Sequence, residues 1–355
     1  MRGDASLFAH LARFDPEELH VVRRRDLGLT AFIALDDTRL GSACGGIRWR
    51  AYPRPEDGVL DVLRLARTMT YKNACAGLDF GGGKTVVLRD PALDPARAFP
   101  ALGEAIDALG GRYVTACDYG TTARELALVR SRTRHVLAED APGALDLGTA
   151  TGVLVAIRAV WRRLAGRGEL DGARVLVQGV GDVGLPLVRL LVEAGADVGF
   201  AEIDEDRAAA CARATGARRI DAARLLATEA DVLAPCAAGE VVTAGVARTL
   251  AVRAIAGAAN NQLADDEAGR VLRARGILYV PDFVANAGAV IVGFETGAGR
   301  AATALDAVRR IEERAARVLA DAEAAGITTT EAALALARAR LAGVSPRRTP
   351  SHSPR

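Results

Sequence analysis

The stretch VLVQGVGDVGLPLV restricts the possible folds of this chain more than any other feature. Three glycines in GxGxxG spacing follow a β-branched strand and precede an apolar helix. Gly179 permits the tight turn, Gly181 lets backbone approach a pyrophosphate, and Gly184 lets the helix pack closely on the strand. Asp182 and Val183 lie in the same turn, where a helix N-terminus offers free N–H groups to phosphates. The pattern predicts a dinucleotide-binding Rossmann-type domain, and the alternative is a glycine turn that holds no ligand.

The acidic residues after the next strand indicate which dinucleotide this turn would bind. The strand ADVGFAE ends at Glu202, at the distance from the glycines where a carboxylate accepts the ribose hydroxyls. Glu202 and its neighbour Ile203 are therefore candidate cofactor-binding residues. A carboxylate there repels a 2′-phosphate, and the acidic residues 204–206 add to that repulsion, so NAD is favoured over NADP. Arg207, the one cation nearby, leaves the strictness of this preference open.

The order of predicted elements indicates an α/β fold with two domains. Strands alternate with helices from about residue 149 to 281, which predicts a parallel, doubly wound sheet. We expect an N-terminal α/β substrate domain over residues 1–136, an NAD-binding Rossmann domain over 137–328, and a cleft between them. After Ala287 the chain is predicted to be almost entirely helical to Leu341, and the helices at about 329–342 are expected to return to the first domain. Residues 343–355 combine Pro, Ser and Arg without apolar partners, which predicts a disordered tail.

The composition argues against several other classes of function. The formal net charge is +2 and aromatic residues make up 4%, so there is no electrostatic case for binding nucleic acid. We find no apolar run of the roughly 18–20 residues that a membrane span needs. Five cysteines and four histidines are scattered without metal-ligand spacing. We therefore expect neither a metal site nor disulfides, and a reducing cytoplasm is the natural compartment.

The stretch MTYKNACAGLDFGGGKTVV contains the candidate reacting centre. A helix is predicted over residues 56–73, because its apolar residues recur at three- and four-residue steps, and Lys72 lies at its C-terminal end. Lys84 opens an apolar strand, where a buried charge is unfavourable unless a partner uses it. Three glycines precede Lys84; we interpret them as an irregular segment that lets backbone approach a small ligand. Two lysines in one pocket disfavour a second positive charge, so one amine is expected to act as a general base. Asp118, after the strand RYVTAC, is placed to relay protons in the same cleft.

Each of these residues also has an ordinary structural interpretation. Lys72 alone is more often a surface residue at a helix end, favoured by the helix dipole. Asp118 alone is more often a cap or turn residue. This interpretation is weaker for Lys84, because an unused lysine in an apolar strand is costly. The catalytic hypothesis therefore depends on all three occurring in a chain with a nucleotide-binding domain.

The chain resembles the amino acid dehydrogenase family of glutamate, leucine, phenylalanine and valine dehydrogenases, and it is most similar to the leucine/valine branch. The resemblance extends from about residue 41 to 296 and keeps the family's order of motifs. The segments that carry it are GGIRWRAYP, LARTMTYKNACAGLDFGGGK, YVTACDYGTT, GVGDVG, DVLAPCA, IAGAANNQL and YVPDFVANAGAVI.

This resemblance implies a role for each matching residue. Lys84 would be the catalytic base, Lys72 would bind the substrate α-carboxylate, and Asp118 would assist proton transfer. The remaining positions would contact the nicotinamide, the nucleotide or the substrate. They are Thr149 at the nicotinamide amide, Cys236 and Ala237 beside the nucleotide, Asn260 and Asn261 near nicotinamide and substrate, and Asn286 and Gly288 in the cleft loop.

The implied reaction is the reversible oxidative deamination of an L-amino acid with NAD. Hydride leaves the α-carbon, the resulting iminium adds water activated by Lys84, and the carbinolamine loses ammonia to give a 2-oxo acid. The partners would be the amino acid, the 2-oxo acid and ammonia, with neither nucleic acid nor membrane involved. A homo-oligomer is expected.

The positions that match the family's side-chain pocket are small and uncharged. Cys44 stands before the paired glycines Gly45 and Gly46, where the glutamate branch has a lysine, so glutamate is not the expected substrate. The other pocket positions are Ala116, Val290 and Gly293. Because Cys44 and Gly293 are smaller than the usual aliphatic residues, a phenylalanine- or tryptophan-preferring enzyme is the alternative. A non-catalytic NAD-binding relative is a second alternative, which the intact lysines and Asp118 argue against.

Overall fold

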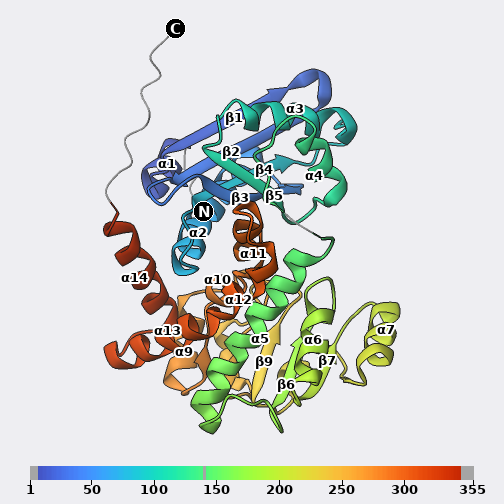
Figure 1. Cartoon of the computed structure of the whole chain (residues 1–355), viewed down its shortest axis with the longest axis vertical. Helices are drawn as coiled ribbons and strands as arrows, with labels where there is room; N and C mark the ends of the chain where they lie inside the picture. The colour runs from blue at the N-terminus through green and yellow to red at the C-terminus, as the bar shows by residue number, and fades with distance from the viewer. Residues whose placement is uncertain (1–6, 139–140, 345–355) are drawn as a thin grey trace. The chain divides into compact units, whose positions relative to one another are not determined.

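The structure is a computed structural model and describes residues 7–138 and 141–344. The chain divides into two compact units (Figure 1). The first unit runs to Leu137 and takes in the chain from Ala337 onward, and the second covers Ala138–Leu336. The second division lies inside helix α14 (Thr329–Ala342), so the last turns of this helix belong to the first unit. The predicted tail lies outside the described residues from position 345 onward.

The first unit contains a five-stranded mixed sheet with the order β1-β2-β4-β3-β5. β2 pairs antiparallel with both β1 and β4, whereas β3 pairs parallel with both β4 and β5. The parallel half therefore places the C-terminal ends of three strands at one edge of the sheet. The strands are β1 (Glu18–Arg24), β2 (Leu29–Asp37), β3 (Ala43–Arg50), β4 (Gly81–Leu88) and β5 (Tyr113–Cys117).

Helices cover both faces of this sheet (Figure 1). On one face α1 and α2 bury a core with Phe32 and Val86, and on the other α3 and α4 bury a core with Ile33 and Tyr113. In α2 the apolar residues recur at three- and four-residue steps, as the sequence predicted. The elements are α1 (Leu7–Phe14), the 3₁₀ turn η1 (Arg25–Leu27), α2 (Pro55–Cys75), α3 (Pro95–Asp107) and α4 (Ala123–Arg130).

The three glycines before Lys84 are part of β4, so the expectation that they form an irregular segment was wrong. A Cβ on Gly82 would overlap the backbone and hydroxyl of Thr70 in α2. A Cβ on Gly83 would lie 2.9 Å from the ring of Tyr113 on the opposite face. The strand is glycine-rich because protein atoms occupy both of its faces at close range, which only residues without side chains permit.

The second unit contains a six-stranded sheet with the order β11-β10-β9-β6-β7-β8, in which all pairs are parallel. Counted from β6, this is the doubly wound order 6-5-4-1-2-3 of a Rossmann domain, as predicted. The glycine turn follows β6, at the point where the strand order reverses direction. The strands are β6 (Arg174–Gln178), β7 (Asp197–Ala201), β8 (Arg218–Arg219), β9 (Val232–Pro235), β10 (Ala254–Ile255) and β11 (Leu278–Tyr279).

Helices form the rest of the second unit and its C-terminal part, again as the sequence predicted after Ala287. Their bounds are α5 (Ala144–Ala165), α6 (Gly184–Glu193), α7 (Glu205–Thr215), η2 (Leu225–Ala227), α8 (Ala244–Thr249), α9 (Asp266–Ala274), α10 (Asp282–Ala285), α11 (Gly288–Gly297), η3 (Ala301–Thr303), α12 (Ala304–Arg309) and α13 (Ile311–Ala325).

Helix α5 corrects one expectation from the sequence. It is long and apolar enough to cross a membrane by length and composition, although the sequence analysis identified no such run. Most of its apolar stretch is buried inside the structure. A Cβ on Gly288, at the start of α11, would overlap the carbonyl of Gly148 in α5, so these helices meet at backbone distance. The apolar character of α5 thus serves helix packing in the core.

Candidate active site

An ion pair between Lys84 and Asp118 is the centre of the candidate site. Lys84 lies on β4, on the face that carries Gly82 and Val86 toward α2, and Asp118 follows the C-terminal end of β5. Lys84 Nζ lies 3.0 Å from Asp118 Oδ2, and the two side chains are 6% and 15% exposed. The sequence predicted both residues for the reacting centre, and the structure places them in direct contact. Their partnership satisfies the lysine that the apolar strand buries.

A second cation, Arg48, binds the same carboxylate oxygen. Its Nε donates to Asp118 Oδ2 at 2.9 Å, and its Nη1 donates to Asp61 Oδ2 at 3.0 Å. Tyr52 Oη also donates to Asp61 Oδ2, at 2.7 Å. The Arg48 side chain is only 11% exposed. Sequence reasoning missed Arg48 and Asp61, and the one available signal was the position of Arg48 in the family-like segment GGIRWRAYP.

The two cations determine the protonation state of Asp118. Burial by itself would raise the pKa of Asp118, but the charges of Lys84 and Arg48 and their hydrogen bonds outweigh it. The pKa of this carboxyl therefore lies well below its usual range. Asp118 is a permanent carboxylate at neutral pH, so it holds charge and position for Lys84.

The paired glycines give the carboxylate its space. A Cβ on Gly46 would lie 2.9 Å from Asp118 Cβ and would overlap the carbonyl of Cys117. A Cβ on Gly45 would overlap the carbonyl of Gly83 on the neighbouring strand. The carbonyl of Gly45 accepts a hydrogen bond from Tyr113 Oη at 2.5 Å. Both glycines are thus required by the protein's own packing around the ion pair.

Three further predicted residues belong to the first unit. Cys44 pairs in register with Gly82 and is fully buried, and burial raises the pKa of its thiol to about 12 although the charge of Lys84 lowers it. Ala116 is half-buried in β5. Lys72 is half-buried in the last turn of α2. Cys44 is a neutral thiol packed in the protein.

In the second unit the glycine turn has the geometry that the sequence predicted. Gly179 has φ +88°, in the left-handed region that favours glycine. A Cβ on Gly184 would overlap the carbonyl of Gly179, whereas a Cβ on Gly181 would meet open space. Ala237 lies against Gly179, and Cys236 lies near Gly184. The predicted flanking residues therefore do flank the turn, and the backbone at Gly181 is open to a ligand.

Glu202 ties the end of β7 to the glycine turn. Its carboxylate accepts hydrogen bonds from the backbone N–H of Val180 at 3.0 Å, Ile203 at 2.8 Å and Asp204 at 3.0 Å. Burial alone would raise the pKa of Glu202, but these hydrogen bonds lower it. The side chain is a fixed anion, and Ile203 beside it is 87% exposed.

The predicted asparagines form a second polar group in this unit. Asn286 Nδ2 donates to the carbonyl of Ala258 at 2.9 Å and to Asn260 Oδ1 at 2.8 Å. Among the described residues, no partner donates to the buried Asn286 Oδ1. Asn261 has φ +53°, and its backbone N–H donates to Asp282 Oδ2 at 2.8 Å.

The other predicted residues of this unit lie on helices. Thr149 is buried on α5, where its hydroxyl donates to the carbonyl of Leu145 at 3.1 Å. Val290 and Gly293 are buried on α11, three residues apart and so on one side of the helix. Of the two residues predicted in a loop, Asn286 lies in the short turn between α10 and α11, whereas Gly288 is the first residue of α11.

These residues fit a dinucleotide better than a metal ion. The open backbone at Gly181, the fixed carboxylate of Glu202 and the unpartnered amide oxygen of Asn286 match the pyrophosphate, ribose hydroxyls and amide groups of such a cofactor. No cluster of three or more His, Cys, Asp or Glu side chains with metal-binding geometry occurs within residues 7–138 and 141–344. All five cysteines are free thiols.

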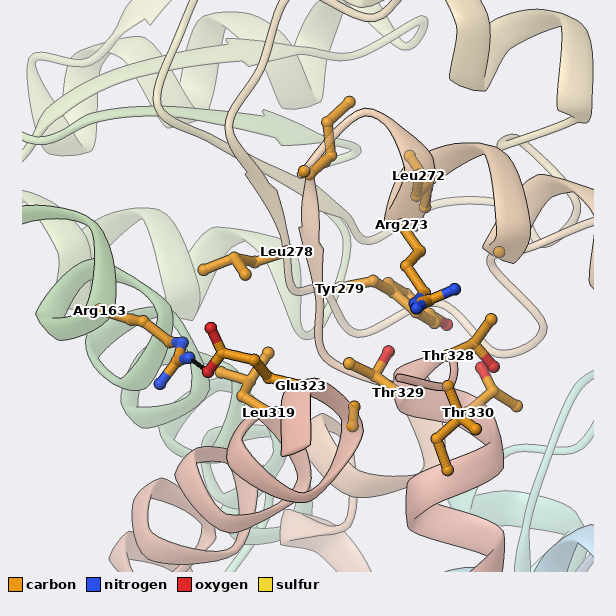
Figure 2. Close-up of a pocket in the computed structure, with 15 residues that line it drawn as sticks. Arg163, Leu272, Arg273, Leu278, Tyr279, Leu319, Glu323, Thr328, Thr329 and Thr330 are labelled. Carbon is orange, nitrogen blue, oxygen red and sulfur yellow. Dashed lines mark ion pairs between the residues drawn. The ribbon is translucent and has the colours of Figure 1, made fainter. Parts of the chain in front are cut away.

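A separate cavity of about 290 Å³ lies in the second unit, beside α9, β11 and α13 (Figure 2). Its lining is mostly apolar and includes the three threonines Thr328–Thr330. Arg163 and Glu323 form an ion pair in its wall. None of the predicted site residues is among those that line it, so it is distinct from the groups described above.

Comparisons with known proteins agree with the geometry. The chain matches the family descriptions "Glu/Leu/Phe/Val dehydrogenase, dimerisation domain" over residues 17–135 and "Glutamate/Leucine/Phenylalanine/Valine dehydrogenase" over residues 199–344. It is 39% identical over 341 residues to leucine dehydrogenase of Bacillus subtilis, with 94% of each chain covered. It is 35% identical over 349 residues to phenylalanine dehydrogenase of Bacillus thermotolerans, covering 95% and 91%. The crystal structure of L-tryptophan dehydrogenase from Nostoc punctiforme superposes with a TM-score of 0.82 at 32% identity, covering 95% of this chain and 99% of that one.

Proposed function

Because this chain belongs to the Glu/Leu/Phe/Val dehydrogenase family, we propose that it oxidatively deaminates apolar L-amino acids of the leucine and valine type, reversibly and with NAD. The observation that carries the proposal is the buried ion pair of Lys84 with Asp118, next to the paired glycines. Binding a dinucleotide alone requires neither a buried lysine nor a second cation on the carboxylate of Asp118. This pair is what a non-catalytic relative would have no reason to keep.

The first unit supplies the acid–base chemistry. When bound, the nicotinamide cofactor accepts the hydride from the substrate α-carbon. Water then adds to the iminium carbon, and Lys84 accepts a proton from this water as the new C–O bond forms. Lys84 returns this proton to the substrate nitrogen, and the C–N bond breaks with its electron pair leaving on ammonia. The carbinolamine hydroxyl gives its proton to Lys84 as the carbonyl of the 2-oxo acid forms. Asp118 holds Lys84 in place throughout, and Lys72 binds the α-carboxylate.

Glu202 supports a preference for NAD. Its carboxylate is ionised and held by three backbone N–H groups at the end of β7. An anion fixed there accepts ribose hydroxyls and repels a 2′-phosphate. The exposed Ile203 next to it offers an apolar surface to the adenine ring.

The substrate side chain is proposed to be apolar and of moderate size. Cys44 is a neutral buried thiol, and Ala116, Val290 and Gly293 carry no charge, so nothing among them would balance a distal carboxylate. The small size of Cys44 and Gly293 favours phenylalanine or tryptophan as the second candidate substrate.

We also propose that the protein is a homo-oligomer and that it acts in a reducing cytoplasm. β1 is the edge strand of its sheet, and Val21 on it is 61% exposed. An unpaired edge with exposed apolar side chains is suited to pairing with a second copy. The description of the matching family domain as a dimerisation domain supports the same assignment.

A substrate panel tests the proposed function directly. We expect the purified protein to form NADH with L-leucine and L-valine, and with L-phenylalanine at lower kcat/KM. L-glutamate should give no turnover, and NADP should replace NAD poorly. A protein that binds NAD but turns over no amino acid would be the non-catalytic relative. A higher kcat/KM for L-phenylalanine or L-tryptophan would favour the second candidate.

A further inference from the structure

We infer that Arg48 is a positioning residue for the proposed deamination: it anchors the Asp118 carboxylate to helix α2 through Asp61, so that Lys84 faces a fixed anion. This inference rests on the proposed function and concerns a residue that neither the motif comparison nor the sequence pattern assigned to the site. It is carried by the geometry of four largely buried charged side chains, two on strands, one on a helix and one in the turn after β5.

Arg48 joins two carboxylates that have no other direct connection. Its Nε and Nη1 donate to Asp118 Oδ2 and Asp61 Oδ2 at 2.9 and 3.0 Å, so the planar guanidinium spans the two acids. Asp61 lies on α2 and also accepts from Tyr52 Oη at 2.7 Å. Because Asp118 is in the turn that follows β5, the link to α2 restrains a carboxylate that its own strand leaves free to rotate.

The link also leaves one oxygen of Asp118 available. Lys84 and Arg48 both contact Oδ2. Within the part of the chain that the structure describes, Oδ1 of Asp118 accepts no hydrogen bond from another side chain. A carboxylate held by two cations through one oxygen presents the other oxygen in a defined direction, where it can accept from the substrate amine or from water.

Titratable groups from each neighbouring element face Asp118. They are Lys84 of β4, Arg48 of β3 with the thiol of Cys44 nearby, the phenol of Tyr113 on β5, and Asp61 of α2 behind Arg48. The thiol and the phenol are neutral, because burial raises the pKa of both. Among the described residues, Lys84 and Arg48 are the cations that pair with Asp118, while Asp61 pairs with Arg48 and Arg64. The removal of Arg48 thus leaves Asp118 paired with Lys84.

The experiment compares Arg48→Met with Arg48→Lys. In Arg48→Met we expect kcat to fall about 100-fold, the loss that a small misplacement of a catalytic group produces, while KM for the amino acid changes little. The loss of one adjacent cation should raise the pKa of Asp118. On the acid side of the pH profile, activity should therefore be lost at a higher pH than in wild type. Arg48→Lys keeps the charge but cannot bridge both acids, so its acid limb should stay at the wild-type pH while kcat is partly recovered.

Two further variants make the result decisive. Arg64→Met is the matched control, because half-exposed Arg64 contacts the other oxygen of Asp61 at 3.0 Å and does not touch Asp118; we expect wild-type kcat and pH profile. If Arg48→Met does not fold, Asp61→Leu removes the acceptor oxygens of the anchor and keeps the cation, so kcat should fall with no shift of the acid limb.

Identical kcat and pH profiles for Arg48→Met and Arg48→Lys would overturn the inference, as would wild-type kcat in a folded Arg48→Met or Asp61→Leu. If the wild-type enzyme itself turns over no amino acid, it is the proposed function that fails.

Discussion

Single side chains in this protein take their chemistry from their neighbours. Asp118 follows a strand end, where a carboxylate would ordinarily be a solvated cap. Two buried cations instead hold its pKa well below the usual range, so it stays ionised at neutral pH. The sequence analysis expected Asp118 to relay protons. A permanent carboxylate is a poor proton acceptor, so its stronger role is to hold Lys84 and orient the substrate.

Glu202 permits a prediction at the same scale. In Glu202→Gln the side chain keeps its shape, but the anion that repels a 2′-phosphate is lost. The ratio of kcat/KM for NAD over NADP should fall at least about fivefold, since two unit charges 4 Å apart repel by about 1 kcal/mol even in water. Steady-state kinetics with both cofactors measure this ratio.

Glu205→Gln is the control for Glu202→Gln. Glu205 is a nearby exposed carboxylate that pairs with Arg219 at 2.6 Å, away from the backbone of the glycine turn. Its removal should leave the cofactor ratio unchanged. If both variants shift the ratio equally, general acidity of the surface, and not Glu202, sets the cofactor preference.

At the scale of elements, the end of α2 depends on the last turns of α14. Arg340 Nη1 donates to the carbonyls of Asn73 and Ala74 at 3.3 and 3.2 Å, and its Nη2 bonds Asp79 at 3.0 Å. These carbonyls also accept from the backbone N–H groups of Leu78 and Gly77 just beyond the helix, and a cation is favoured at a helix C-terminus. Lys72 lies in the same turn, so α14 stabilises the segment that carries the proposed carboxylate ligand.

Arg340→Ala should therefore affect stability and substrate binding together. We expect the free energy of unfolding to fall by about 1–2 kcal/mol, and KM for the amino acid to rise while KM for NAD stays constant. Denaturant titration and steady-state kinetics measure the two effects. Arg338→Ala, on the same helix with its guanidinium over the Tyr71 ring, is the control and should leave KM near wild type. An unchanged KM for the amino acid in Arg340→Ala would show that α14 does not support substrate binding.

Elements with regular patterns were predictable from sequence, and those set by packing were not. The period of α2 and the strand before the glycine turn agree with the structure within a few residues. β3 was missed because Gly45 and Gly46 interrupt its apolar pattern, and they are there to accommodate Gly83 and Asp118. The glycines of β4 were misinterpreted for the same reason, since their close neighbours come from α2 and from Tyr113.

The residues of the candidate site were likewise predictable where they stand in sequence motifs and not where packing brings them together. Lys84, Asp118 and the glycine turn stand in recognisable motifs, and the structure gives each a matching environment. The bridge from Arg48 to Asp61 joins a strand to a helix across the face of a sheet, and no periodicity in the sequence specifies which side chains meet there. The predicted influence of Lys72 on Lys84 stays a prediction.

At the scale of the whole molecule, the features for cofactor binding and those for acid–base chemistry lie in different units. The second unit holds the features of a dinucleotide site, with a parallel sheet in Rossmann order and the fixed anion of Glu202. The first unit holds the buried charges that the chemistry needs. Loss of the base should therefore abolish turnover without loss of cofactor binding, because the two functions reside in separately packed cores.

The most direct measurement is NADH formation with L-leucine by wild type, Lys84→Ala and Lys84→Arg, alongside NAD binding by fluorescence titration. Lys84→Arg keeps a cation for Asp118, but a guanidinium does not give up its proton in proteins, so it cannot act as a base. We predict that both variants bind NAD like wild type and lose at least about 100-fold in kcat. Turnover near the wild-type rate in either variant would show that Lys84 is not the base.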